Sequence, residues 1–165
     1  MFNLFKKNKA KDIALVAPVS GKVVAITEVP DPVFAQKMMG EGVAIQLTDE
    51  TIVAPCDGTI TLIPDTKHAF GITNEHGMEL LVHIGLETVG LAGEGFTVLV
   101  NQGDKVTKGT PIIKINKSFI EDKGINLITP LVVLNHQNYE FKEFKANMDV
   151  IAGQSEVITY QPKAN

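Results

Sequence analysis

The stretch TKHAFGITNEHGMELLVHIGLETV, residues 66–89, contains two apolar runs on either side of a polar segment. The runs at residues 69–73 and 78–84 have the composition of strands, and the segment at residues 74–77 between them ends in glycine. A short polar segment that ends in glycine between two apolar runs is typical of a β-hairpin. We therefore predict a hairpin with a four-residue loop.

This hairpin would bring two histidines together. A four-residue loop pairs Thr73 with Met78, and the same antiparallel register then places His68 directly opposite His83. Cross-strand neighbours have Cβ atoms roughly 4.5 to 5.5 Å apart, so both imidazoles would reach one small ligand, metal ion or phosphoryl group. A shift of one residue would put them on opposite faces. A lone histidine in an apolar strand is most often structural, but two that meet across a strand pair favour a functional site.

The second run also carries a longer pattern. GMELLVHIGLETV, residues 77–89, has a glycine, two residues, three apolar residues, a histidine, and then an apolar residue, Gly, an apolar residue, any residue, Thr and an apolar residue. This pattern resembles the signature of the glucose-type enzyme IIA domain of the bacterial phosphoenolpyruvate-dependent sugar phosphotransferase system. Residues 30–35, 66–70 and 93–96 resemble further segments of that family, and the likeness extends from residue 13 to residue 157.

The resemblance implies a chemistry for the two histidines. His83 corresponds to the histidine that is phosphorylated, so the protein would be a phosphotransferase component with a phosphohistidine intermediate. His68 would stabilise the phosphoryl group, and Thr66 would orient the ring of His68. The implied donor is the phosphocarrier HPr, and the implied acceptor is a cysteine on the enzyme IIB domain of a sugar permease. No cofactor is required, although His68 and His83 could supply two ligands of a zinc ion at a partner interface.

A partner surface is expected around these histidines. We predict a shallow apolar collar formed by Val33, Phe34, Met38, Met39 and Phe70. Adjacent methionines suit a surface that must adapt to differently shaped partners. The resemblance adds two acids that would meet a basic residue of HPr, Asp31 and Glu87; the glutamate replaces the usual aspartate.

Composition restricts the kind of partner. Residues 1–12 hold four Lys and one Asp, whereas the remainder holds 11 Lys and 18 acids within a total formal charge of −4. An acidic body argues against nucleic acid, which proteins bind through a basic face. The basic first segment, residues 1–12, is predicted to be a flexible tail that could contact anionic lipid weakly. The chain has no arginine, so any phosphoryl group must be stabilised by histidine, lysine, hydroxyl or backbone N–H groups.

Length and pattern predict the fold. A chain of 165 residues suits one domain, at residues 13–165. It contains no apolar run of about 20 residues and no secretory signal, and its single cysteine, Cys56, cannot form an internal disulfide. We therefore expect a cytoplasmic protein.

Short strand-like runs recur along the chain, separated by Gly and Pro turns, and the motif Ala-Pro-x-x-Gly occurs at residues 17–21 and 54–58. We predict an all-β fold, an antiparallel β-sandwich or distorted barrel of the duplicated hybrid motif type with short helical turns. Further strands are expected at residues 43–48, 96–100, 112–115, 128–134 and 156–160. Short helices are expected at residues 32–39, 117–122 and 138–144.

Two alternatives use the same residues. The chain could be a regulatory binding module whose phosphorylation state controls transporters or metabolic enzymes, and the sequence does not separate this role from phosphoryl relay. A zinc peptidase of the lysostaphin type would need a His-x-His pair, but Ile84 and Gly85 follow His83. The sequence also leaves open which sugar permease is served.

Overall fold

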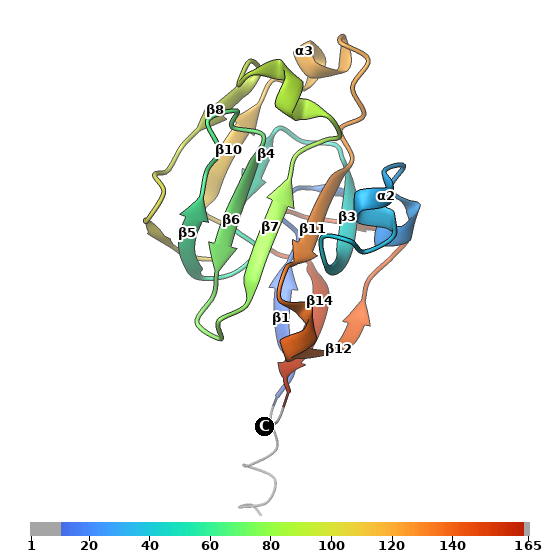
Figure 1. Ribbon diagram of the computed structural model, residues 1–165, viewed down its shortest axis with the longest axis vertical. Coiled ribbons are helices and arrows are strands. Elements are labelled where there is room, and N and C mark those ends of the chain that lie inside the picture. Colours follow the sequence, from blue (N-terminus) through green and yellow to red (C-terminus); the bar gives the residue numbers. More distant parts are fainter. Residues whose placement is uncertain (1–10, 164–165) are drawn as a thin grey trace, which may run out of the picture.

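The structure, a computed structural model, describes residues 11–163, and most of its regular elements are antiparallel strands (Figure 1). The strands are β1 (Ile13–Val16), β2 (Gly21–Ala25), β3 (Glu41–Leu47), β4 (Thr51–Val53), β5 (Gly58–Leu62), β6 (Ala69–Thr73), β7 (Glu79–His83), β8 (Phe96–Val98), β9 (Lys105–Val106), β10 (Pro111–Ile115), β11 (Thr129–Val133), β12 (Tyr139–Phe144), β13 (Met148–Val150) and β14 (Glu156–Pro162). The helical segments are η1 (Ile26–Glu28), α2 (Pro32–Ala35), η2 (Thr88–Leu91), α3 (Lys117–Glu121) and η3 (His136–Asn138). The predicted all-β class is confirmed.

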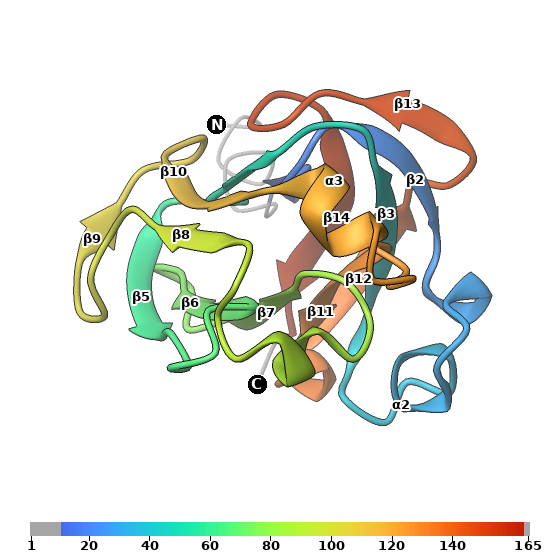
Figure 2. The same cartoon turned by 90° about the horizontal axis from the view of Figure 1, so that it is seen from above.

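The strands form three sheets. The largest has eight strands in the order β13-β2-β3-β11-β7-β6-β5-β9, and the smaller ones have the orders β4-β10-β8 and β1-β14-β12. Figure 1 shows β5, β6, β7 and β11 side by side, with α2 beyond β3 and with α3 above the sheet. Seen from above, β8 and β10 lie across the interior from β6 and β7 (Figure 2). This arrangement is the predicted sandwich.

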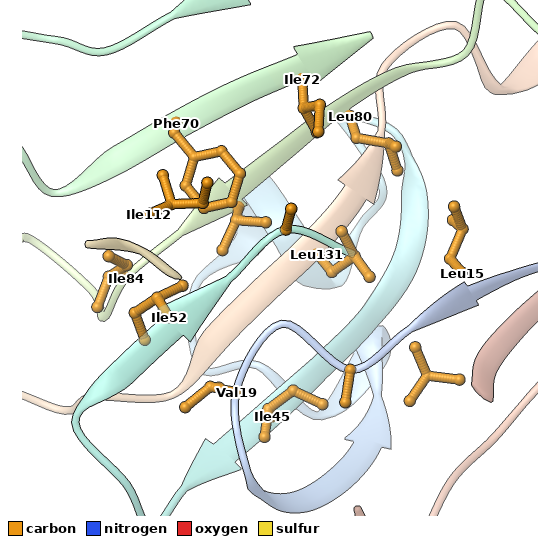
Figure 3. Close-up of a cluster of buried hydrophobic side chains, with 14 of the residues drawn as sticks. Leu15, Val19, Ile45, Ile52, Phe70, Ile72, Leu80, Ile84, Ile112 and Leu131 are labelled. Atoms are coloured by element: carbon orange, nitrogen blue, oxygen red, sulfur yellow. The ribbon is translucent and has the colours of Figure 1, made fainter. Parts of the chain in front are cut away.

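The two faces of the large sheet carry different clusters of apolar side chains. One face belongs to the main core, which includes Phe70 and Ile72 of β6 and Ile112 of β10, and Figure 3 shows Phe70 beside Ile112. The other face carries a second cluster that includes Ala69, Leu81 and the α2 residue Phe34. Because side chains alternate along a strand, β6 and β7 contribute to both clusters.

The repeated Ala-Pro-x-x-Gly motif forms two equivalent turns, which lead directly into β2 and β5. The turns bond to each other's flanking strands: Val16 N–H donates to the Pro55 carbonyl at 2.9 Å, and Val53 N–H donates to the Pro18 carbonyl at 2.7 Å. Each repeat thus supplies the carbonyl acceptor for a backbone N–H of the strand before the other repeat.

Most of the predicted elements occur where the sequence placed them, with differences at their ends. The predicted helix at residues 32–39 is limited to the single turn of α2. The predicted helix at residues 138–144 is wrong, because this segment is the strand β12, which pairs with β14. Residues 139–142 of its sequence YEFKEF alternate between aromatic and charged residues, and pairing with β14, with a register shift between Phe141 and Glu143, selects the strand over the helix.

No helix within residues 11–163 is long and apolar enough to cross a membrane. The predicted basic tail at residues 1–12 lies outside the described residues as far as residue 10.

Candidate functional site

His83 is the last residue of β7, and its ring is fixed by the loop that follows it. Its Nδ1 lies 2.8 Å from the carbonyl oxygen of Gly85. A carbonyl oxygen can only accept, so Nδ1 carries the proton and donates it in this bond. In the neutral ring the lone pair is then on Nε2, which is the nitrogen that can act as a nucleophile or bind a ligand.

The position of the Gly85 carbonyl depends on the absence of a side chain. Gly85 has φ +76°, and an added Cβ would lie 2.8 Å from Cγ2 of Thr88 and 3.1 Å from Cδ2 of Leu127. The peptide that carries this carbonyl is also held from its other side, because Leu86 N–H donates to the Asn126 carbonyl at 2.9 Å. Only glycine combines this conformation with such close packing.

The surroundings keep His83 neutral. Burial lowers the pKa of His83 from 6.5, and the hydrogen bond to Gly85 and the charge of Asp31 oppose this shift without reversing it. The neutral form, with one ring proton, therefore predominates at pH 7.

His68 comes to His83 by a route that the sequence did not predict. Thr73 pairs with Glu79, and Ala69 pairs with His83, so the predicted register with His68 directly opposite His83 is wrong by one residue. Asn74 N–H donates to the Met78 carbonyl at 3.1 Å, so the loop closes over residues 75–77, and the Asn74 side-chain oxygen accepts the backbone N–H groups of residues 76 and 78, at 2.9 and 3.0 Å. Such a local bond stabilises a tight turn.

The two imidazoles nevertheless meet. His68 precedes β6 and follows Lys67, which has a left-handed φ of 61°, so strand alternation does not determine where its ring points. The ring centroids of His68 and His83 are 4.9 Å apart, with the planes inclined at 78°. The Thr66 hydroxyl lies 2.8 Å from Nδ1 of His68. Burial, followed by the neighbouring charge of His83, lowers the pKa of His68 from 6.5.

Helix α2 brings apolar side chains to the same place. Asp31 caps this helix, with its Oδ1 accepting from Val33 N–H at 3.0 Å. Phe34 packs against His83 with ring centroids 5.2 Å apart and is itself buried. Of the other residues predicted for the collar, Val33, Met38 and Met39 are 39%, 69% and 36% exposed.

Phe70 does not belong to this surface. It is fully buried in the main core, on the opposite face of the sheet, so its predicted place in the collar is wrong. Its cross-strand partner is Val82, which faces the main core, and not Leu81, which faces the second cluster with Ala69.

The two predicted acids line one groove. Asp31 and Glu87 both contribute to a depression of about 540 Å³, together with Lys123. Glu87 is exposed and has a left-handed φ of 60°. A partner could place a basic side chain between the two carboxylates, which come from segments far apart in the sequence.

Residues 11–163 contain no group of three or more His, Cys, Asp and Glu side chains that could hold a metal ion. Zinc held by His68 and His83 would therefore need ligands from a partner, and this stays a prediction. Cys56 is buried, and its pKa is raised to about 12 by burial and by Asp57, so its thiol is unreactive at neutral pH.

Two features of the site were not assigned from the sequence. The first is the Gly85 carbonyl as the acceptor for His83, and the second is the buried Thr88 behind it, whose hydroxyl bonds to the Ile84 carbonyl. Both residues stand at fixed positions of the histidine motif, but a backbone acceptor leaves no side-chain signal of its own.

Comparisons with known proteins identify relatives that match most of this chain. The profile of the family described as phosphoenolpyruvate-dependent sugar phosphotransferase system, EIIA 1, matches residues 13–139. The PTS system glucose-specific EIIA component of Staphylococcus aureus strain Mu50 is 45% identical over 157 residues, which cover 94% of this chain and 95% of the relative. The component of the same name from Oceanobacillus iheyensis is 43% identical over 159 residues, covering 94% and 96%. Among solved structures, the glucose permease IIA from Mycoplasma capricolum has a TM-score of 0.82 and 32% identity, and covers 91% of this chain and 96% of that chain.

Proposed function

Because the chain belongs to the EIIA 1 family of the phosphoenolpyruvate-dependent sugar phosphotransferase system, we propose that it accepts a phosphoryl group from phospho-HPr on His83. It then passes the group to a cysteine of an enzyme IIB domain. Family membership itself places the chain in phosphoryl transfer during sugar uptake. The observation that supports His83 as the acceptor is the bond from its Nδ1 to the Gly85 carbonyl, which leaves a lone pair on Nε2.

The first transfer exchanges one phosphorus–nitrogen bond for another. Nε2 of His83 attacks the phosphorus in line, and the bond from phosphorus to the donor's imidazole nitrogen breaks. The donor ring leaves with that electron pair. The proton of His83 stays on Nδ1, hydrogen-bonded to the Gly85 carbonyl, throughout, so no proton has to enter or leave the ring. A fixed tautomer of this kind costs no reorganisation at the moment of reaction.

His68 is placed to stabilise the transferred group. If the Thr66 hydroxyl donates to Nδ1 of His68, the proton of His68 is on Nε2 and can be donated to a phosphoryl oxygen. The lowered pKa values of His68 and His83 keep the pair from carrying two positive charges before the transfer. In a chain without arginine, such a neutral donor takes the place of a guanidinium clamp.

In the second transfer a cysteine thiolate attacks the phosphorus, and the electron pair of the broken bond returns to Nε2 of His83. The proton of the thiol leaves to solvent when the thiolate forms. Both partners would dock on the collar of Val33, Met38 and Met39 beside the histidines. A basic residue of HPr would enter the groove between Asp31 and Glu87.

The relatives named as glucose-specific components support a glucose permease as the acceptor. The predicted cytoplasmic location belongs to the same proposal. The regulatory alternative would use the same histidines and collar, and it stays a prediction.

The test is incubation of the purified protein with phosphoenolpyruvate, enzyme I and HPr, followed by intact mass spectrometry before and after acid treatment. The wild type should gain one acid-labile phosphate, and His83→Ala should gain none. His68→Gln should still be phosphorylated but should transfer onward about a hundredfold more slowly. Thr66→Val should resemble His68→Gln, whereas Thr66→Ser should not. His136→Gln, in η3 beyond the end of β11, is the matched control. A wild type that takes no phosphate would overturn the proposal.

A further inference from the structure

Thr88 is one of the few buried polar residues in the described part of the chain, and its hydroxyl is not needed for packing. Its exposed fraction is 0%, and its Oγ1 donates to the Ile84 carbonyl at 2.6 Å. Valine has the same shape without a hydroxyl, and a buried hydroxyl stabilises little beyond the bond that it makes. The hydroxyl therefore points to a role in fixing the backbone at Ile84.

Ile84 lies between His83 and the glycine that accepts from it, and both of its polar backbone groups are engaged. Its N–H donates to the His68 carbonyl at 2.8 Å, and its carbonyl accepts from Thr88. The next peptide carries the Gly85 carbonyl, and its N–H is held by the Asn126 carbonyl at 2.9 Å. Two successive peptide planes are thus tied down, with Gly85 as the flexible joint between them.

Thr88 restrains this joint in two ways. Its hydroxyl holds the peptide before Gly85, and its methyl group fills the space beside the glycine, where an added Cβ would lie only 2.8 Å from Cγ2. Without the hydroxyl, the peptide between Ile84 and Gly85 can rotate about the φ of the glycine. The carbonyl that accepts from Nδ1 of His83 then loses its fixed direction.

We propose that Thr88 is a positioning residue that holds His83 in the tautomer with the proton on Nδ1. It acts through Ile84 and the Gly85 carbonyl and touches neither the phosphoryl group nor a partner. When the acceptor at Nδ1 is not fixed, the proton shifts in part to Nε2, and rings in that form have no lone pair at the nitrogen that attacks phosphorus. The kinetic consequence rests on the proposed function, whereas the tautomer does not.

The experiment compares Thr88→Val, which removes the hydroxyl and keeps the shape, with Thr88→Ser, which keeps the hydroxyl. The matched control is Thr129→Val. Thr129 is equally buried and donates to the Leu127 carbonyl at 2.9 Å, but its bond does not involve the peptides that lead to Gly85. Nitrogen-15 NMR of the histidine side chains reports the tautomer of His83 in each variant, and phosphorylation by phospho-HPr reports the rate.

We expect Nδ1 to be protonated in the wild type, in Thr88→Ser and in Thr129→Val, and Thr88→Val to show a mixture of the two tautomers. Phosphorylation of Thr88→Val should be about tenfold slower, with a pH dependence that differs from that of Thr129→Val. Thr88→Val with an unchanged tautomer, or Thr88→Ser with a mixed one, would overturn the proposal. If Thr88→Val does not fold, the tautomer of His83 in Thr88→Ser still tests the proposal. If the wild type accepts no phosphate at all, the proposed function fails, and the tautomers still test the role of Thr88.

Discussion

Replacing Gly85 by alanine should destabilise the protein far more than the same replacement at other glycines, and two matched glycines separate the causes. Gly85 combines a φ of +76° with close neighbours at 2.8, 3.1 and 3.2 Å from an added Cβ. Gly124 has the same φ of +76° but nothing within 4 Å. Gly90 has neither a positive φ nor a neighbour within 4 Å.

The expected magnitudes follow from these differences. Gly124→Ala measures the cost of a left-handed conformation, about 1 kcal/mol. Gly85→Ala adds crowding against Thr88, Leu127 and the Asn126 carbonyl, which costs roughly a further 2 kcal/mol. Gly90→Ala should be neutral or stabilise by up to about 0.5 kcal/mol, because alanine reduces the freedom of the unfolded chain.

Urea unfolding followed by far-UV circular dichroism gives the free energy of unfolding for all three variants. If Gly85→Ala costs no more than Gly124→Ala, the close packing behind the Gly85 carbonyl is refuted. The same variant should lose the single tautomer of His83, because relief of the crowding displaces the carbonyl that accepts from Nδ1.

Three further predictions concern pH, the hairpin and the collar. Because burial lowers the pKa of both His68 and His83 from 6.5, their neutral forms stabilise the fold above pH 6.5, and this contribution is lost as the pH falls through 6.5 toward the lowered values. The free energy of unfolding, measured with urea, should therefore decline more steeply as the pH falls in the wild type than in a double His→Gln variant. Equal slopes of this free energy against pH would contradict the lowered pKa values. Asn74→Ala removes the acceptor of two loop N–H groups and the donor to a tyrosine hydroxyl, so unfolding measurements should show a loss of about 2 to 3 kcal/mol, and amide exchange should increase across the hairpin. Val33→Asp should weaken binding of HPr about tenfold in calorimetric titration, whereas Leu134→Asp, which is almost equally exposed at 38% against 39%, should not; equal losses would mean that the collar is not the docking surface.

The sequence was sufficient to place His83, but not to pair its strand correctly. The motif and the alternation of β7 assign the histidine to the face of Leu81, as its contact with Phe34 of the second apolar cluster confirms. The register depends on how the Asn74 side chain folds the loop, which no count of loop residues reveals. The wrong register also explains why Phe70 was wrongly predicted in the collar. The predicted register sets Phe70 opposite Leu81, and the observed one sets it opposite Val82.

The proximity of the two histidines was predicted correctly for a reason that does not hold. The observed register would separate them if His68 were part of the strand. They meet because His68 lies just before β6, which begins at Ala69, and because Lys67, in a left-handed conformation, changes the direction of the chain. A left-handed lysine is uncommon, and nothing in its neighbours' composition predicts it.

The duplicated scaffold explains why the site needs both halves of the chain. Each Ala-Pro-x-x-Gly turn leads into a strand and then into a connection that contains one left-handed lysine, Lys37 after β2 and Lys67 after β5. The first connection includes α2 and sets Phe34 against the ring of His83 at 5.2 Å, and the second ends in His68 at 4.9 Å. One connection thus supplies the aromatic ring that packs against His83, and the other supplies the second imidazole. The reciprocal bonds between the two turns fix the halves relative to each other. A change in either turn should therefore alter the positions of Phe34 and His68 around His83, although neither turn touches that ring.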